Sequence, residues 1–299
     1  MAGEAMVDIE GLAASYGSVK AVSGISMSVS QGELVALLGP NGAGKSTTIA
    51  CLLGLHHADQ GVLTVASMSP QAAVRAGRVG AMLQISGLPV GAKVREVVGL
   101  AVALHRRRGP TVKELLKLTD LDGLSNRDAT QLSGGQAQRL RFAMALAGAP
   151  PLLFLDEATA GMDVESRDVF WRAVRTMADA GTTVLFTTHY LQEADRYADR
   201  IVMLARGRVV AEGTAGELKS QLGGGRTIEL TSDDPDQVRA LGLPGLESIT
   251  VQGRTIRIQT SDSDATLRLL FRSDIEFSEV TVSGSDLDQV MLALSHEDD

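Results

Sequence analysis

Residues 33–46 have the sequence ELVALLGPNGAGKS, in which a short apolar run leads directly into a glycine-rich octet. An apolar run of this length is typical of a buried strand, so residues 33–38 predict one. The segment that follows, residues 47–55, has Ile49, Leu52 and Leu53 at helical spacing and predicts a helix. The chain is therefore expected to pass from a strand through a glycine loop into a helix.

The octet Gly39 to Ser46 fits the pattern G-x-x-x-x-G-K-[ST] in full. Its glycines allow positive φ angles and let backbone N–H groups approach phosphate oxygens closely. The N-terminus of a helix starting near Lys45 adds partial positive charge, and Lys45 itself adds a full charge for the β- and γ-phosphates. Because the strand and helix context is also present, we interpret the octet as a nucleotide phosphate site in which Ser46 can ligate Mg²⁺.

Two further apolar runs, residues 152–155 and 184–186, predict buried strands, and residues 164–180 between them have the length of a helix. A strand–helix–strand repeat predicts an α/β fold, with a parallel sheet covered by helices on both faces. Between roughly residues 90 and 147 the strands disappear. There, helical spacing predicts a helical insertion that begins with Val94, Val97, Val98 and Ala101.

Two acidic residues stand where the strand at residues 152–155 ends: Asp156 and, directly after it, Glu157. In P-loop enzymes a strand-end carboxylate is the usual protein partner of Mg²⁺. Because successive side chains on extended backbone point apart, we expect Asp156 to face the metal through water and Glu157 to face the γ-phosphate and polarise the attacking water. The alternative, a solvated acidic pair, is disfavoured by the phosphate loop.

The pentapeptide LSGGQ at residues 132–136 is followed by a predicted helix over residues 137–148. Ser133 and the glycine N–H groups would form a second anion site at a helix N-terminus. One nucleotide already has a phosphate loop in its own chain, so a second cradle makes sense if it serves the nucleotide of a partner chain. With this motif the sequence resembles the nucleotide-binding subunit of an ABC transporter, from Tyr16 to His189.

The resemblance implies a P-loop NTPase fold of the ABC cassette type, with a parallel-sheet core, N-terminal antiparallel strands and the helical insertion. It implies ATP hydrolysis with ATP and Mg²⁺ as cofactors. It assigns catalysis to Glu157, His189, Lys45 and Gln84, and Mg²⁺ ligation to Ser46, Gln84 and Asp156. It assigns nucleotide contacts to Tyr16, Gly39, Asn41, Gly42, Gly44, Lys45, Ser46, Thr47, Ser133, Gly135, Gln136 and Asp163.

Within those sets the resemblance gives four residues individual roles. Tyr16 would stack on adenine, Gln84 would sense Mg²⁺ and the attacking water, and His189 would contact the γ-phosphate. Asp163 would lie in a loop that crosses the dimer interface. The other histidines are interpreted as structural or solvated: His56, His57, His105 and His296.

The charge of the chain changes near the glycine run at residues 223–225. Residues 226–299 carry 15 acidic and 6 basic side chains, a net charge of −9, whereas residues 1–225 carry 21 acidic and 22 basic ones, a net charge of +1, so the acidity of the chain belongs to its C-terminal part. We expect a nucleotide-binding domain over residues 1–222, a linker over 223–226 and an accessory domain over 227–299.

The accessory domain reads as β-α-β-β-α-β over residues 227–282, which suggests a small ferredoxin-like α+β domain. A final helix is expected to place Leu287, Val290, Met291 and Leu294 on one face. The pattern resembles the C-terminal extension of ATPase subunits from drug- and antibiotic-exporting ABC systems. With no metal-ligand spacing or nucleophile in it, an assembly or regulatory role is expected.

Composition limits the partners. An acidic chain with ten aromatic residues is poorly suited to nucleic acid, and no apolar run is long enough to span a bilayer. The single Cys51 excludes an intrachain disulfide, and the first residues carry no signal pattern, so we expect the cytosol.

The resemblance implies a homodimer that closes on two Mg-ATP and drives a separate membrane permease from the cytoplasmic face of the membrane, for export of drug, antibiotic or lipid-like substrates. Residues 85–90 could contact a permease helix or simply pack as a loop. Two alternatives remain: a soluble ABC ATPase for assembly or repair, and a binding module that uses nucleotide only to change shape, which the intact Glu157 and His189 disfavour.

Overall fold

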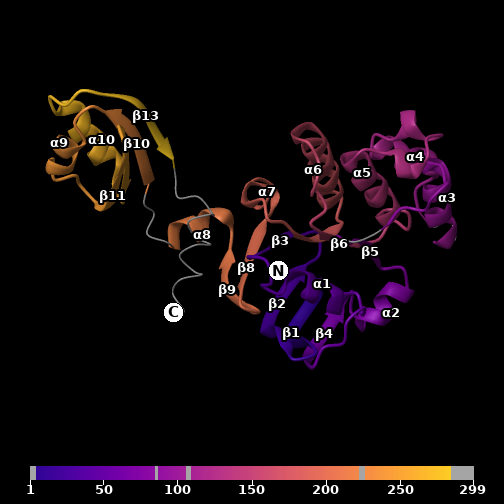
Figure 1. Ribbon diagram of the computed structural model, residues 1–299. Helices are drawn as coiled ribbons and strands as arrows, with labels where there is room; N and C mark the ends of the chain where they lie inside the picture. Colours follow the sequence, from indigo (N-terminus) through magenta and orange to yellow (C-terminus); the bar gives the residue numbers. More distant parts are fainter. Residues whose placement is uncertain (1–4, 85–86, 106–108, 222–225, 284–299) are drawn as a thin grey trace. The chain divides into compact units, whose positions relative to one another are not determined.

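The computed structural model describes residues 5–84, 87–105, 109–221 and 226–283. The chain divides into two compact units, Met1–Glu212 and Gly213–Asp299 (Figure 1). The division falls before the glycine run at residues 223–225, so α8 (Ala215–Gln221) belongs to the second unit and not to the nucleotide-binding domain in which the charge change would place it. Each unit has its own buried core.

A six-stranded sheet forms the centre of the first unit, in the order β5-β6-β7-β3-β8-β9. Its first five strands pair in parallel, as the strand–helix–strand pattern predicts. Every residue of β3, β6 and β7 is buried, because both faces of this sheet are covered. The expectation of helices on both faces is only partly correct, since further strands, and not helices alone, cover one face. The strands are β3 (Leu34–Leu38), β5 (Val79–Met82), β6 (Leu152–Asp156), β7 (Thr183–Thr187), β8 (Arg200–Ala205) and β9 (Arg208–Gly213).

An antiparallel sheet lies on one side of this central sheet, and most of the helices lie on the other (Figure 1). Its order is β2-β1-β4, with β1 (Ala5–Tyr16), β2 (Val19–Ser30) and β4 (Gln60–Val65). Apolar residues of these strands share one core with α1 (Lys45–Leu52) and the parallel sheet. The N-terminal antiparallel strands that the resemblance implies are therefore confirmed.

The predicted helical insertion is also confirmed. It contains α3 (Val94–Leu104), α4 (Val112–Leu118) and α5 (Gly134–Ala145), with short 3₁₀ turns at η1 (Asp122–Leu124) and η2 (Ala129–Gln131). In α3 the residues at helical spacing form the buried face. Helix α5 begins three residues earlier than predicted because Ser133, not a later residue, caps it.

Several of the scarce aromatic residues lie together where this insertion meets the sheet. Phe142 of α5 contacts Phe170 of α6 (Val164–Asp179) at 4.7 Å between ring centroids, and Trp171 contacts Phe186 of β7 at 4.5 Å. The cluster fixes α5 and α6 against the strand that ends at the candidate site. The remaining helices of this unit are α2 (Pro70–Arg75) and α7 (Leu191–Tyr197).

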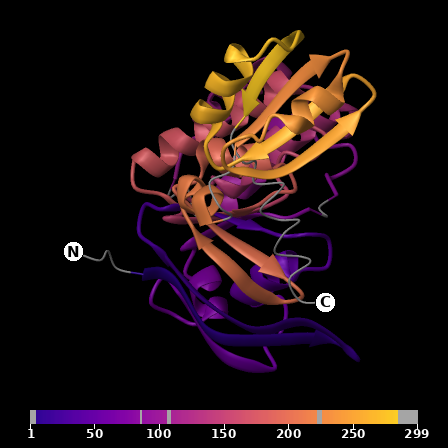
Figure 2. The ribbon, with the colours of Figure 1, turned by 90° about the vertical axis from the view of Figure 1, so that its left-hand side faces the viewer.

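The second unit contains an antiparallel sheet in the order β11-β12-β10-β13, with α9 and α10 packed against it (Figure 2, orange to yellow). The elements are β10 (Arg226–Ser232), α9 (Pro235–Ala240), β11 (Leu246–Gln252), β12 (Thr255–Thr260), α10 (Ser263–Arg272) and β13 (Phe277–Ser283). This order is that of the predicted ferredoxin-like domain, in which each β-α-β crossover leaves room for a strand between its two strands. The expected final helix lies outside the described residues.

Along the described residues, every helix is too short or too polar to cross a bilayer.

Candidate active site

The glycine loop joins β3 to α1, as the sequence predicts. Two of its glycines are required by geometry. Gly44 has φ 103°, and a Cβ on it would lie 2.7 Å from the Ala21 carbonyl oxygen, while a Cβ on Gly39 would collide with the Leu204 carbonyl. The loop can follow this path only without side chains at these two positions, and it leads directly into the N-terminus of α1.

Lys45 is the first residue of α1 and is 6% exposed. Its Nζ donates hydrogen bonds to the carbonyl oxygens of Gly39 at 2.7 Å and Pro40 at 3.1 Å. Burial lowers the pKa of the Lys45 ammonium below its ordinary value, and the nearby charges of Glu157 and Asp156 oppose that shift. A partly desolvated cation at a helix N-terminus is suited to an anionic ligand.

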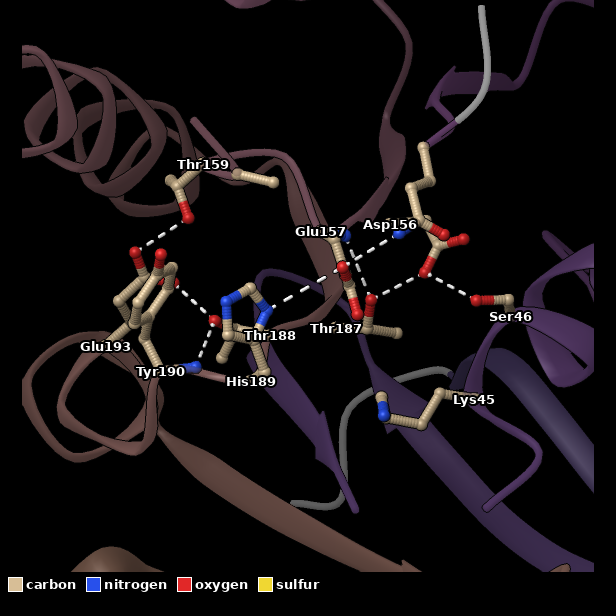
Figure 3. A network of polar contacts seen from close by, with 12 residues as sticks. Lys45, Ser46, Asp156, Glu157, Thr159, Thr187, Thr188, His189, Tyr190 and Glu193 are labelled. Atoms are coloured by element: carbon tan, nitrogen blue, oxygen red, sulfur yellow. Dashed lines mark hydrogen bonds and ion pairs between the residues drawn. The ribbon is translucent and has the colours of Figure 1, made fainter. Parts of the chain in front are cut away.

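Asp156 is the last residue of β6, and its side chain connects this strand to α1 and β7. Its Oδ1 accepts hydrogen bonds from Ser46 Oγ at 3.1 Å and from Thr187 Oγ1 at 2.6 Å (Figure 3). A hydroxyl and a carboxylate oxygen held this close are hard donors of the type that Mg²⁺ takes, so the donor set fits that ion. In the described ranges no group of three or more His, Cys, Asp or Glu could hold a metal ion.

The backbone of Glu157 differs from the prediction, although its side chain lines the cavity as expected. Its φ is 48°, in the left-handed region, so the extended alternation that we expected does not extend to it. Its N–H donates to both the carbonyl and the hydroxyl of Thr187, at 3.2 and 3.0 Å, which holds this turn. Its Oε2 accepts from Gln84 Nε2 at 3.0 Å and lies 3.6 Å from His189 Nδ1 (Figure 3 shows the histidine pair).

A cavity of about 630 Å³ opens over these groups. Nine predicted residues line it or its rim: Asn41, Gly42, Gly44, Lys45, Ser46, Thr47, Gln84, Glu157 and His189. Sequence reasoning missed three lining residues of β2, which are Val19, Lys20 and Ala21. The sequence feature that could have identified them is their position within five residues after Tyr16, the predicted adenine contact.

Tyr16 does not line the cavity. It is 52% exposed, and its ring stacks on His56 with centroids 4.2 Å apart. One face of the tyrosine ring is thus covered by a histidine that we had interpreted only as structural or solvated. His56 is itself fixed, because its Nε2 lies 3.1 Å from the Ser15 carbonyl oxygen.

The LSGGQ residues form a separate group. Ser133 caps α5, accepting from Gln136 N at 3.3 Å, while Gln136 Oε1 accepts from Ser133 N at 3.0 Å. Asp163 caps α6 and accepts from Ser166 N at 2.7 Å, a hydrogen bond that lowers the pKa of its carboxyl group. None of the predicted partner-side residues lines the cavity: Ser133, Gly135, Gln136 and Asp163.

Comparison with known proteins agrees with these features. Residues 22–160 match the family model described as ABC transporter. The chain is 36% identical to the daunorubicin resistance ATP-binding protein DrrA3 of Streptomyces coeruleorubidus, over 98% of this chain and 96% of that protein. It is 35% identical to the Nod factor export ATP-binding protein I of Rhizobium etli, over 86% of this chain and 84% of that protein.

Solved structures show the same fold. An ATP-binding subunit of an ABC transporter superposes with a TM-score of 0.65 and 27% identity, covering 73% of this chain and 93% of that one. The ATP-binding cassette MJ0796, in a dimeric post-hydrolysis state bound to ADP and Pi, gives a TM-score of 0.64 and 26% identity, covering 70% of this chain and 98% of that one.

Proposed function

The chain belongs to the ABC transporter family and is an ABC-type ATPase, and from this premise we propose that two copies close around two Mg-ATP and drive a separate membrane permease. One observation carries the proposal. The predicted catalytic residues meet at one cavity, while Ser133, Gly135 and Gln136 lie outside it. A second copy, facing the first, supplies those three residues to each cavity.

At each site the chain's own groups divide the work. Lys45 and the N-terminus of α1 hold the β- and γ-phosphates, and Ser46 and Asp156 would hold Mg²⁺, which would neutralise charge at the phosphates. Glu157 accepts the proton of the attacking water, with Gln84 and His189 placing that carboxylate. Tyr16 stacks its open ring face on adenine.

Export is the proposed direction because DrrA3 is named for daunorubicin resistance and the rhizobial relatives for Nod factor export. The proposed cargo is therefore a drug-like, antibiotic or lipid-like molecule. The proposed place is the cytoplasmic face of the membrane, held there by the permease. At the expected permease contact, Val90 is 89% exposed, whereas residues 85–86 lie outside the described residues.

The neighbouring reading frame gives the direct test of the transporter assignment. We expect it to encode a membrane protein of six helices that recruits this chain to membranes when the two are produced together. ATP hydrolysis by the reconstituted pair should respond to the transported compound, measured as phosphate release in proteoliposomes. If the chain hydrolyses ATP but stays in the supernatant when this membrane protein is supplied, the result would instead favour the alternative function, a soluble ABC ATPase for assembly or repair.

We expect the second unit to serve assembly or regulation, with no part in ATP binding. A chain ended after Gly225 should keep ATP binding, because every lining residue of the cavity precedes it, but should lose assembly with the permease. Co-purification and nucleotide binding measure the two effects. Full-length Ile258→Asp, which buries a charge in the core of this unit, should reproduce the assembly defect without shortening the chain. Unchanged export and assembly by both variants would contradict this role.

A further inference from the structure

Glu193 of α7 is a buried carboxylate that the described cavity does not use. It is 3% exposed. Its Oε1 accepts a hydrogen bond from Thr159 Oγ1 at 2.7 Å, and its Oε2 accepts one from Thr188 Oγ1 at 2.6 Å (Figure 3). Both threonines are themselves 2% exposed. A carboxylate out of water needs such partners, and hydrogen bonds to it are stronger than those between neutral groups.

The two threonines belong to the two loops that carry the groups at the γ-phosphate end of the cavity. Thr159 lies two residues after Glu157, in the loop from β6 to α6, and Thr188 directly precedes His189, in the loop from β7 to α7. Thr188 Oγ1 also accepts from Tyr190 N at 2.9 Å, so the backbone is held on both sides of His189. One carboxylate thereby joins both loops.

Arg167 of α6 extends the same cluster. Its Nε lies 3.5 Å from Glu193 Oε1, it donates to the Met162 carbonyl at 3.3 Å, and its guanidinium lies over the Tyr190 ring at 4.2 Å from the centroid. The arginine supplies the counter-charge that a buried carboxylate requires. It also adds a second connection between the loop after Glu157 and the loop that carries His189.

The loops are joined on their other side by Thr187, whose carbonyl and hydroxyl accept from Glu157 N. The backbone of Glu157 is therefore fixed by Thr187, and the loop after Glu157 is fixed by Glu193 through Thr159. The remaining contact between the two catalytic side chains, Glu157 Oε2 to His189 Nδ1, is 3.6 Å long, so their separation depends on how the loops are placed.

We propose that Glu193 is a positioning residue that sets the distance between Glu157 and His189 by binding Thr159 and Thr188 at once, without contacting the nucleotide. The proposal rests on the roles proposed above for Glu157 and His189. It predicts that disturbing Glu193 lowers the rate of the chemical step and leaves ATP binding almost unchanged, because the groups that Glu193 binds, on Thr159, Thr188 and Arg167, do not belong to the phosphate loop.

Glu193→Gln tests this with a side chain of the same shape. Both threonine hydroxyls donate to the carboxylate, but a Gln amide has one acceptor and one donor end, so one hydrogen bond must reverse and Arg167 loses its counter-charge. We expect kcat to fall about tenfold or more while KM for Mg-ATP stays within about twofold. An unchanged kcat in a folded protein would overturn the proposal, as would a rise in KM with kcat unchanged.

Glu33→Gln is the matched control. Glu33 is also paired with an arginine, with Arg200 Nε 2.6 Å from its carboxylate. It directly precedes the first residue of β3, whereas the phosphate loop follows the last residue of that strand. The control should lower the melting temperature without changing kcat. If Glu33→Gln and Glu193→Gln lower kcat equally, the effect of Glu193 is general destabilisation and the proposal is wrong.

The threonines keep the proposal testable if changes at Glu193 prevent folding. Thr188→Val and Thr159→Val should each lower kcat, whereas Thr188→Ser, which keeps the hydroxyl, should restore it. The two Val changes should combine non-additively, because both act on one carboxylate. Additive effects would show that Glu193 does not couple the loops.

Separate outcomes distinguish this inference from the proposed function. If Glu157→Gln and His189→Ala leave hydrolysis intact, the assigned catalytic roles fail. If those variants lose hydrolysis while Glu193→Gln keeps the kcat of the unmodified chain, only the role of Glu193 fails.

Discussion

Glu157→Gln should reduce ATP hydrolysis by at least about a hundredfold while leaving ATP bound, since a positioned general base contributes a factor of that order or more. The amide has nearly the size of the carboxylate, but it cannot take a proton from water. The phosphate loop, Lys45 and Ser46 are unchanged, so ATP affinity should stay close to that of the unmodified chain. Phosphate release and equilibrium nucleotide binding measure the two quantities separately.

The control for this variant is Glu247→Gln, an identical chemical change at an exposed position of β11 in the second unit. It should hydrolyse ATP at the unmodified rate. If Glu157→Gln retained most of its activity while this control behaved as expected, another group would have to act as the base, and the assignment of Glu157 would be wrong.

Lys45→Ala should weaken ATP binding about tenfold to hundredfold, because hydrogen bonds to charged groups contribute about 1.5–3 kcal/mol each. The variant removes the one lysine at the start of α1 and leaves the glycine loop, whose path Gly39 and Gly44 determine. Hydrolysis should fall further than binding, because the lysine also stabilises charge that develops in the transition state. Titration with ATP and a rate measurement at saturating ATP separate these losses.

Lys117→Ala provides the comparison, since it removes the same charge from an exposed position of α4. Its ATP affinity should match that of the unmodified chain. An equal loss of affinity in both variants would mean that net charge, not the placement of Lys45, decides binding, which would contradict the phosphate site.

The parts of the fold that local sequence determines were predicted well. The runs at residues 33–38, 152–155 and 184–186 form buried strands because each is an apolar segment of strand length, followed by a glycine or a polar residue at which the strand ends. The start of α5 was missed by three residues, although Ser133 and Gln136 already had the spacing of a capping box. Boundaries of this kind depend on single side-chain contacts.

Features that need contacts between distant residues were not predicted. The left-handed backbone at Glu157 depends on Thr187, and the role of Glu193 depends on Thr159, 34 positions away. No local pattern distinguishes Glu193 from a solvated helix glutamate. The stacking of His56 on Tyr16 likewise joins two segments that only the fold brings together.

The central claim is that each ATP is shared by two copies of the chain, and the molar mass of Glu157→Gln in solution tests it most directly. Light scattering should give the monomer mass without nucleotide and twice that mass with saturating Mg-ATP. Adding Ser133→Arg, which places a bulky side chain at the start of α5, should keep ATP bound but prevent the dimer. A Glu157→Gln protein that binds Mg-ATP and remains a monomer, or a dimer that Ser133→Arg does not affect, would contradict the shared site.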